Sequence, residues 1–160
     1  MARYGADLAL LLLGGFRHLA DAASAELSRR GYHDVRPSHD FAMRAVAAGA
    51  GNASELGRRL AISKQAAAKT ITLLEDRGYL IRVDDPIDAR RKLLRVTELG
   101  FEVMRQGETI FDELRARWES QIGSEELVRL ETNLASVLGA SLVRPEEPGW
   151  IAQDVGELPQ

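Results

Sequence analysis

Basic and amide side chains gather in one stretch of this sequence, at spacings that suit binding to a polyanion. Lys64, Gln65 and Lys69 share one face of an expected helix, and Arg-Arg-Lys fills residues 90–92. Lysine and arginine bind phosphate, and both, like glutamine, can also bond base edges in the major groove of DNA. The chemistry indicated is therefore recognition of nucleic acid.

The distribution of charge along the chain agrees with this interpretation. The whole chain has 21 basic and 24 acidic side chains, which argues against a protein that coats nucleic acid through bulk positive charge. Residues 52–97 reverse the balance with ten basic and six acidic side chains, whereas residues 98–160 have five and thirteen. Positive charge is concentrated where phosphates would be met.

Catalytic chemistry is not indicated. The three histidines, His18, His33 and His39, fit no metal-binding spacing, and the sequence has no recognisable catalytic triad, carboxylate pair or phosphate-binding loop. Because the chain has no cysteine, disulfides, thiolate metal sites and thiol-based sensing are excluded. We expect no enzyme, no metal and no cofactor.

Two helices must position the basic face. Asn52 followed by Glu55 predicts a capped helix over residues 53–60, and Ser63 can cap a second helix that Gly78 ends. Apolar residues recur every three or four positions along the second helix. The opposite, basic face of that helix is then left open.

A β-hairpin is expected directly after these helices. Residues 79–83 and 93–96 are typical of short strands, joined by the polar segment 84–92 that contains the basic run. The fold class predicted is mainly α with a small β-hairpin wing, a winged helix-turn-helix. A helix pair or a basic turn alone occurs in many proteins that bind no DNA, but the combination favours DNA binding.

Residues 74–100 resemble the wing region of the MarR family of bacterial transcription regulators. That family's pattern is Leu-Glu-x-x-Gly, an apolar strand with Arg, Asp-Pro-x-Asp-x-Arg, a second strand and Leu-Thr-x-x-Gly. Its counterparts here are Leu74-Glu75, Gly78, Arg82, the run 85–90 and the run 97–100. The sequence departs by one extra residue between Gly78 and Arg82, which could shift the strand register by one, and by Val96 where Leu is usual.

The resemblance implies a homodimer whose two recognition helices enter successive major grooves of a palindromic double-stranded DNA operator. By position, Arg90 would insert into a minor groove, and Asp88 would orient it or pair with a neighbouring arginine such as Arg82 to brace the wing. Asp88 also has the simpler interpretation of an ordinary turn residue. The other expected DNA contacts are Ser63, Lys64, Gln65, Ala68, Lys69 and Thr72 of the recognition helix and Arg58, Arg59, Arg91 and Lys92 at phosphates.

The chain is expected to be one domain spanning residues 1–160. Helices within 7–30 and 98–142 are too apolar to stand alone in water, so we expect them to pair with a second subunit around a DNA-binding lobe at 38–97. Packing within one chain is the alternative. The tail 143–160 is expected to be irregular. The run Leu8 to Leu13 is too short to span a membrane, so we expect a cytoplasmic protein with no membrane contact.

The resemblance also implies a small-molecule effector between the dimerisation helices and the DNA-binding lobe. Arginines near that junction suggest an anionic or phenolic compound, although each residue there could equally be a packing or linker residue. The candidates are Tyr32, His33, Arg36, His39, Phe41, Met43 and Arg44. The function predicted is a DNA-binding transcription regulator, a repressor released by an effector; the alternative is a dimeric helical ligand-binding or protein-interaction module without DNA affinity.

Overall fold

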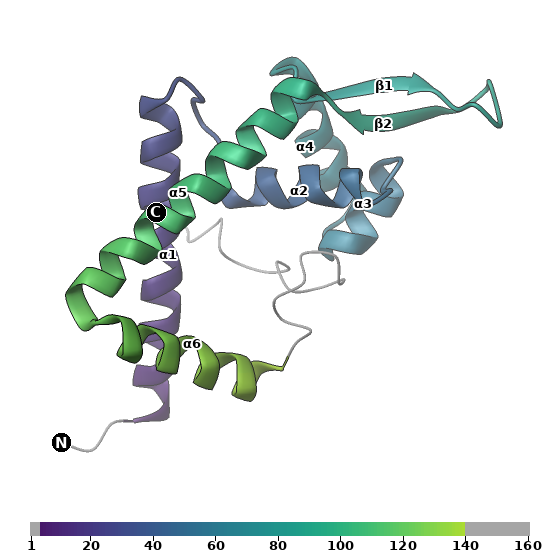
Figure 1. Cartoon of the computed structure of the whole chain (residues 1–160). Helices are drawn as coiled ribbons and strands as arrows, with labels where there is room; N and C mark the ends of the chain where they lie inside the picture. The colour runs from purple at the N-terminus through teal and green to yellow at the C-terminus, as the bar shows by residue number, and fades with distance from the viewer. Residues whose placement is uncertain (1–3, 140–160) are drawn as a thin grey trace, which may run out of the picture.

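The computed structural model describes residues 4–139, and the predicted fold class is confirmed: eight elements, mainly helical, with one two-stranded hairpin (Figure 1). The tail expected at 143–160 lies outside the described residues. The elements are α1 (Gly5–Arg29), α2 (Pro37–Ala47), α3 (Ala53–Leu60), α4 (Lys64–Asp76), β1 (Leu80–Asp84), β2 (Lys92–Val96), α5 (Glu98–Ile122) and α6 (Ser124–Leu138).

Side-chain caps begin the helices of the DNA-binding lobe where the sequence predicts them. Asn52 Oδ1 accepts the Glu55 amide at 3.0 Å, and Ser63 Oγ accepts the Ala66 amide at 3.0 Å. Such caps satisfy amides that have no partner inside the helix. The sequence also offers Ser124 as a cap for a helix to about Leu138, but Gly123 is the residue that precedes this helix, and no side chain of the described residues caps its start.

The core of the lobe forms where α2, α3, α4 and the hairpin meet α5. Met43, Leu56, Ile71, Leu74 and Leu94 are fully buried there. The apolar stripe predicted for the second helix of the pair is therefore confirmed. Burying this stripe fixes the rotation of α4 about its axis, so the opposite face of the helix must point outward.

The hairpin is regular and projects away from the helices (Figure 1). Its antiparallel register runs from Leu80 opposite Val96 to Asp84 opposite Lys92, one residue to one residue throughout. The extra residue before Arg82 therefore causes no bulge. The base of the wing packs closely against α5 at Gly100. A Cβ atom at this position would lie 2.4 Å from the Tyr79 carbonyl oxygen.

Helices α1, α5 and α6 form the limb of the molecule: α5 runs from the base of the hairpin past α1 to α6, and both α1 and α5 also pack into the core of the lobe (Figure 1). The first turns of α1 carry Leu8, Leu10, Leu11, Leu12 and Leu13, each at least 39% exposed. By length and composition alone, α1 would suffice to cross a membrane. A helix that packs against a second subunit has the same apolar character, so this feature alone is weak evidence for a membrane span.

Candidate nucleic-acid interface

The outward face of α4 carries the polar residues that the sequence predicts. Lys64, Gln65, Lys69 and Thr72 are exposed and Ala68 is half-buried between them. This face borders a shallow surface hollow that also includes Asp76 and Arg77. Since the Thr72 hydroxyl donates to the Ala68 carbonyl oxygen at 3.1 Å, its methyl group and oxygen lone pairs remain for a ligand.

Six cations on α3, α4 and the wing tip form no ion pair with any carboxylate among residues 4–139. They are Arg58, Arg59, Lys64, Lys69, Arg90 and Arg91. By contrast, Lys92 forms an ion pair with Asp84 across the hairpin. A cation without a carboxylate partner keeps its full charge for phosphate.

Short hydrogen bonds give the wing tip a defined shape. Asp88 Oδ1 accepts the Arg90 amide at 3.1 Å, and the Asp88 carbonyl oxygen accepts the Arg91 amide at 2.9 Å. Asp85 Oδ1 accepts the Ile87 amide at 2.8 Å. Asp88 thus contacts the wing backbone, as turn-forming aspartates do, and leaves the Arg90 side chain available to a ligand.

The pairing suggested between Asp88 and Arg82 is wrong. Arg82 Nε and Nη2 donate to the two carboxylate oxygens of Glu75, at 2.8 and 3.3 Å. Arg82 lies in β1, close to the end of α4 that carries Glu75, whereas Asp88 is at the far end of the hairpin. Arg82 therefore links the wing to α4 through Glu75, a contact that the sequence analysis did not predict.

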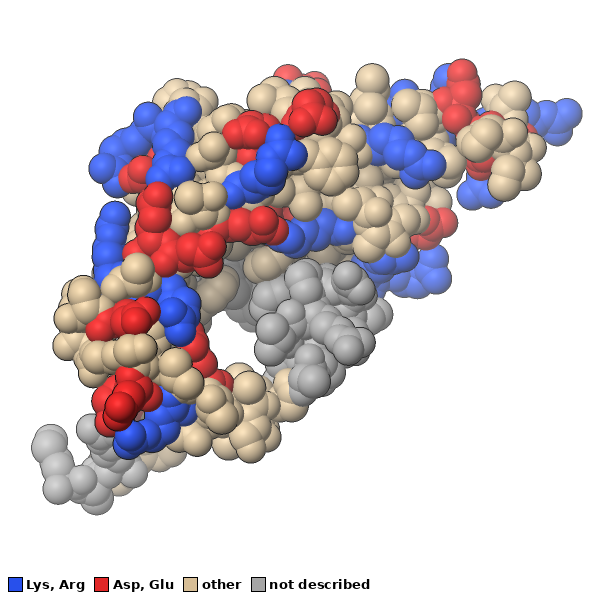
Figure 2. Space-filling model, in the orientation of Figure 1, with Lys and Arg blue, Asp and Glu red and all other residues tan. Residues whose placement is uncertain are grey.

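Acidic side chains outnumber basic ones along α5, whereas several basic side chains gather at the hairpin. Figure 2 shows blue Lys and Arg side chains at the end of the hairpin and below it, and red Asp and Glu side chains along α5. The carboxylates on α5 include Glu102, Glu108, Asp112 and Glu113. The end of the hairpin and the surface below it thus form one basic region in this view, and a second group of basic side chains lies at the upper left, at the opposite end of the molecule.

Most of the residues predicted for an effector pocket do not line one. Met43 is fully buried in the core, and Tyr32 and Phe41 pack against it. His33 bonds Ser28, and His39 Nδ1 accepts the Arg36 amide at the start of α2. Met43, Tyr32 and Phe41 thus turn toward the core, whereas His33 is exposed on the loop before α2, an arrangement that the sequence did not reveal.

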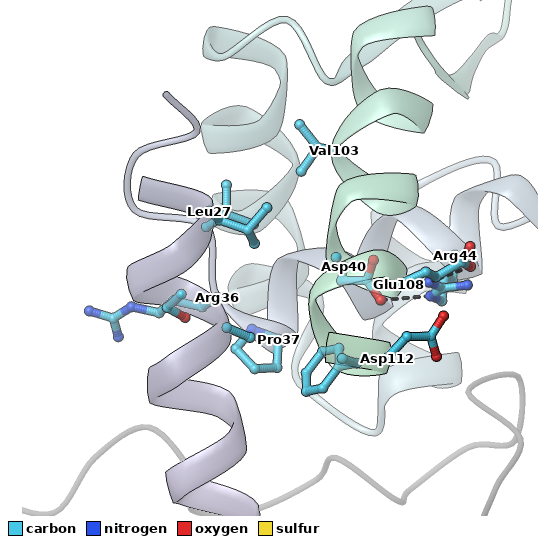
Figure 3. Close-up of a pocket in the computed structure, with 13 residues that line it drawn as sticks. Leu27, Arg36, Pro37, Asp40, Arg44, Val103, Glu108 and Asp112 are labelled. Atoms are coloured by element: carbon cyan, nitrogen blue, oxygen red, sulfur yellow. Dashed lines mark hydrogen bonds and ion pairs between the residues drawn. The ribbon is translucent and has the colours of Figure 1, made fainter. Parts of the chain in front are cut away.

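A cavity does lie at the predicted junction, between α1, α2 and α5 (Figure 3). It has a volume of about 220 Å³, and of the seven predicted residues only Arg36 and Arg44 line it. Its walls are mostly apolar, with a few charged side chains from α2 and α5. The other residues that line it include Leu27, Val103, Phe111, Asp40, Glu108 and Asp112.

Arg44 forms ion pairs with two carboxylates at this cavity. Its Nε donates to Asp40 Oδ2 at 2.6 Å and its Nη2 to Glu108 Oε1 at 3.0 Å (Figure 3). Burial raises the pKa of the Asp40 carboxyl, and the hydrogen bond from Arg44 partly opposes that rise. The Arg36 guanidinium points away from the cavity in the same view. An anionic ligand would meet an arginine whose charge is already shared with two carboxylates.

The α1–α2 connection joins this cavity to the recognition helix. Val35, Arg36 and Pro37 line the cavity. One to two residues earlier, the carbonyl oxygens of His33 and Asp34 accept hydrogen bonds from Arg77, at the end of α4. No sequence pattern indicates this contact, because Arg77 lies more than 40 positions along the chain.

Comparison with known proteins identifies the lobe. Residues 43–91 match the model of the MarR family. A 72-residue segment is 31% identical to the HTH-type transcriptional regulator BilQ of Clostridioides difficile (strain CD3), covering 45% of this chain. The aligned segment spans 46% of that protein, less than half its length.

The whole fold resembles solved structures as well. Wild-type MarR of E. coli in its apo form aligns with a TM-score of 0.65 at 18% identity, over 87% of this chain and 100% of that one. A mutant of S. aureus MepR bound to an oligodeoxyribonucleotide aligns with a TM-score of 0.59 at 19% identity, over 85% and 97%. At these identities the likeness establishes the fold.

Proposed function

We propose that the chain is a member of the MarR family of winged helix-turn-helix proteins and a dimeric, sequence-specific DNA-binding regulator of transcription. The observation that carries the proposal is the set of six cations on α3, α4 and the wing tip that pair with no carboxylate of the described residues. Each cation that neutralises a phosphate releases counterions, so the set supplies affinity. We also propose that the chain works in the cytoplasm and has no enzymatic activity.

In this proposal α4 reads bases and the wing reaches the adjacent minor groove. Lys64, Gln65 and Lys69 are long enough to bond base edges, while Ala68 and Thr72 suit a thymine methyl group. Arg90 at the wing tip enters the minor groove. Arg58, Arg59 and Arg91 contact phosphates, and Ser63 holds the start of α4.

Dimerisation is proposed from the limb formed by α1, α5 and α6. Its apolar side chains are exposed in a single chain, including Leu10 at 65%, Val128 at 50% and Val137 at 84%. A second copy would cover this surface and place two recognition helices on a palindromic operator. The related MepR structure contains an oligodeoxyribonucleotide.

The cavity between α1, α2 and α5 is the proposed effector site, and effector binding would release a repressor from DNA. The support is its position, because the connection that lines the cavity also contacts the end of α4 through Arg77. A ligand that moves this connection would shift the recognition helix. A ligand can release the protein from DNA only if the ligand-bound conformation differs from the DNA-bound one, and this shift would supply the difference.

The test is fluorescence anisotropy with DNA fragments that flank the protein's own gene, at two salt concentrations, beside a scrambled fragment. Preferential binding to one fragment, weakening steeply with salt, is the expected result. Equal binding to every fragment would reject sequence specificity for these sites. No binding at all would favour the alternative, a dimeric ligand-binding or interaction module.

A further inference from the structure

The charges around the cavity between α1, α2 and α5 do not balance. Arg44 is surrounded by Asp40 and Glu108, and Asp112 lies below it on the same side of the cavity (Figure 3). Among the described residues, no basic group pairs with Asp112. One guanidinium thus faces three carboxylates, since Arg36 points elsewhere.

The remaining walls are apolar and the space is small. Leu27 and Val103 are buried, and the Phe111 ring borders the opening with 41% of its surface exposed. A volume of about 220 Å³ is below the roughly 300–1,000 Å³ of sites for drug-sized ligands. The occupant should therefore be a small molecule with an apolar body, of about one ring.

We propose that this cavity binds a small amphipathic organic cation, with its apolar body against Leu27, Val103 and Phe111 and its ammonium group beside Asp112 and Glu108. The ligand class follows from charge complementarity, because an anion would be repelled by the same carboxylates and would meet only Arg44, which already pairs with two of them. The claim that this cation acts as an effector rests on the proposed function. The claim that it binds the cavity does not.

The ammonium group has a defined second effect on the cavity. Arg44 of α2 pairs with Asp40 on its own helix and with Glu108 on α5. The Glu108 side chain is 59% exposed. A cation beside Glu108 competes with Arg44 for that carboxylate. Binding would then loosen the link between α2 and α5 and leave the Asp40–Arg44 pair in place.

The test uses three probes with the same carbon body: phenylbutylamine, phenylbutanol and phenylbutyrate. Calorimetric titration of the full-length, DNA-free protein should show the amine binding most tightly and the carboxylate most weakly. Stronger binding of phenylbutyrate than of phenylbutylamine would overturn the proposal, and so would no binding by any of the three.

A matched pair of variants locates the binding. Asp112→Asn removes a carboxylate of the cavity without breaking an ion pair between described residues, and should weaken amine binding about two- to fivefold, the size of one partly exposed ion pair, with phenylbutanol unaffected. Asp21→Asn makes the same change on an exposed part of α1 outside the cavity and should change nothing. Equal amine affinity of Asp112→Asn and the wild type would contradict the assignment.

DNA anisotropy separates this inference from the proposed function. If the amine binds but the protein does not bind DNA, the ligand class stands and the regulatory function fails. If the protein binds an operator and phenylbutyrate binds the cavity better than the amine does, the function stands and the ligand class fails.

Discussion

The side chain of Arg77 binds the backbone of Asp34: the Arg77 Nη1 atom donates a hydrogen bond to the Asp34 carbonyl oxygen at 2.8 Å. The same nitrogen donates to the His33 carbonyl oxygen at 3.1 Å, and the Asp34 carboxylate is 3.7 Å from Nη2. Asp34 has a positive φ of 55°, in the left-handed region. One side chain at the end of α4 thus satisfies the acceptors of a strained turn.

Arg77→Gln should lower the free energy of unfolding by about 1–2 kcal/mol, because two carbonyl acceptors lose a charged donor in a partly buried position. Urea unfolding measures this value. Asp34→Asn is the matched control, since asparagine tolerates positive φ and leaves both carbonyl groups in place. Were this control as damaging as Arg77→Gln, the carboxylate contact would be the important one.

Arg90→Ala should weaken DNA binding on every sequence and lower the salt slope of log affinity by about 1, the contribution of one phosphate-region cation. Salt-dependent anisotropy gives both values. Arg117→Ala, which removes an exposed cation from α5, should leave affinity and slope as they are. If Arg90→Ala behaves like Arg117→Ala, the wing tip does not contact DNA.

The sequence predicted those parts of the fold that local interactions determine. Asn52 and Ser63 cap helices as predicted because a cap needs only the amides two or three positions ahead. Likewise, the open face of α4 follows from its own apolar stripe. The outward placement of Lys64 and Lys69 therefore follows from residue spacing alone.

The cavity could not be predicted in the same way. Its acidic wall combines Asp40 of α2 with Glu108 and Asp112 of α5, which are distant in the sequence. The spacing of Asp40 and Arg44 on one helix permits an ion pair but does not say what else surrounds it. Which face of α2 turned toward α5 was decided by packing, and this determined that Met43 entered the core and Arg44 the cavity.

Gly100→Ala should destabilise the protein by about 2–3 kcal/mol, the upper part of the range for overpacked sites. Its Cβ atom would lie 2.4 Å from the Tyr79 carbonyl oxygen and 2.7 Å from Val96 Cγ1, so α5 would have to move away from the hairpin. Gly107→Ala is the control on the same helix, because nothing among the described residues lies within 4 Å of its Cβ position. Urea unfolding should show this second variant as stable as wild type or up to about 1 kcal/mol more stable.

Leu10→Glu should convert the protein from a dimer to a monomer, because it places a charge on an apolar surface that the second subunit would bury. Light scattering should give about twice the chain mass of 17.6 kDa for the wild type and the chain mass for the variant. Ile87→Glu puts the same charge on the wing tip, where Ile87 is 94% exposed, and should stay dimeric. A monomeric wild type would reject the proposed interface.

Mild acid should destabilise the fold through His39. Burial, together with the cations of Arg77 and Arg36, lowers the pKa of His39 below its ordinary value of 6.5. As the pH falls below 6.5, the unfolded chain takes up a proton before the folded one, so stability declines until the folded-state pKa is passed.

His39→Gln removes the titrating group while keeping an acceptor for the Arg36 amide, which now bonds His39 Nδ1 at 3.1 Å. Urea unfolding at about pH 8 and about pH 5.5 should show a smaller loss of stability for this variant than for the wild type, by up to about 1.4 kcal/mol for each pKa unit of difference between the two states. Identical losses in the two proteins would assign the acid sensitivity to other groups.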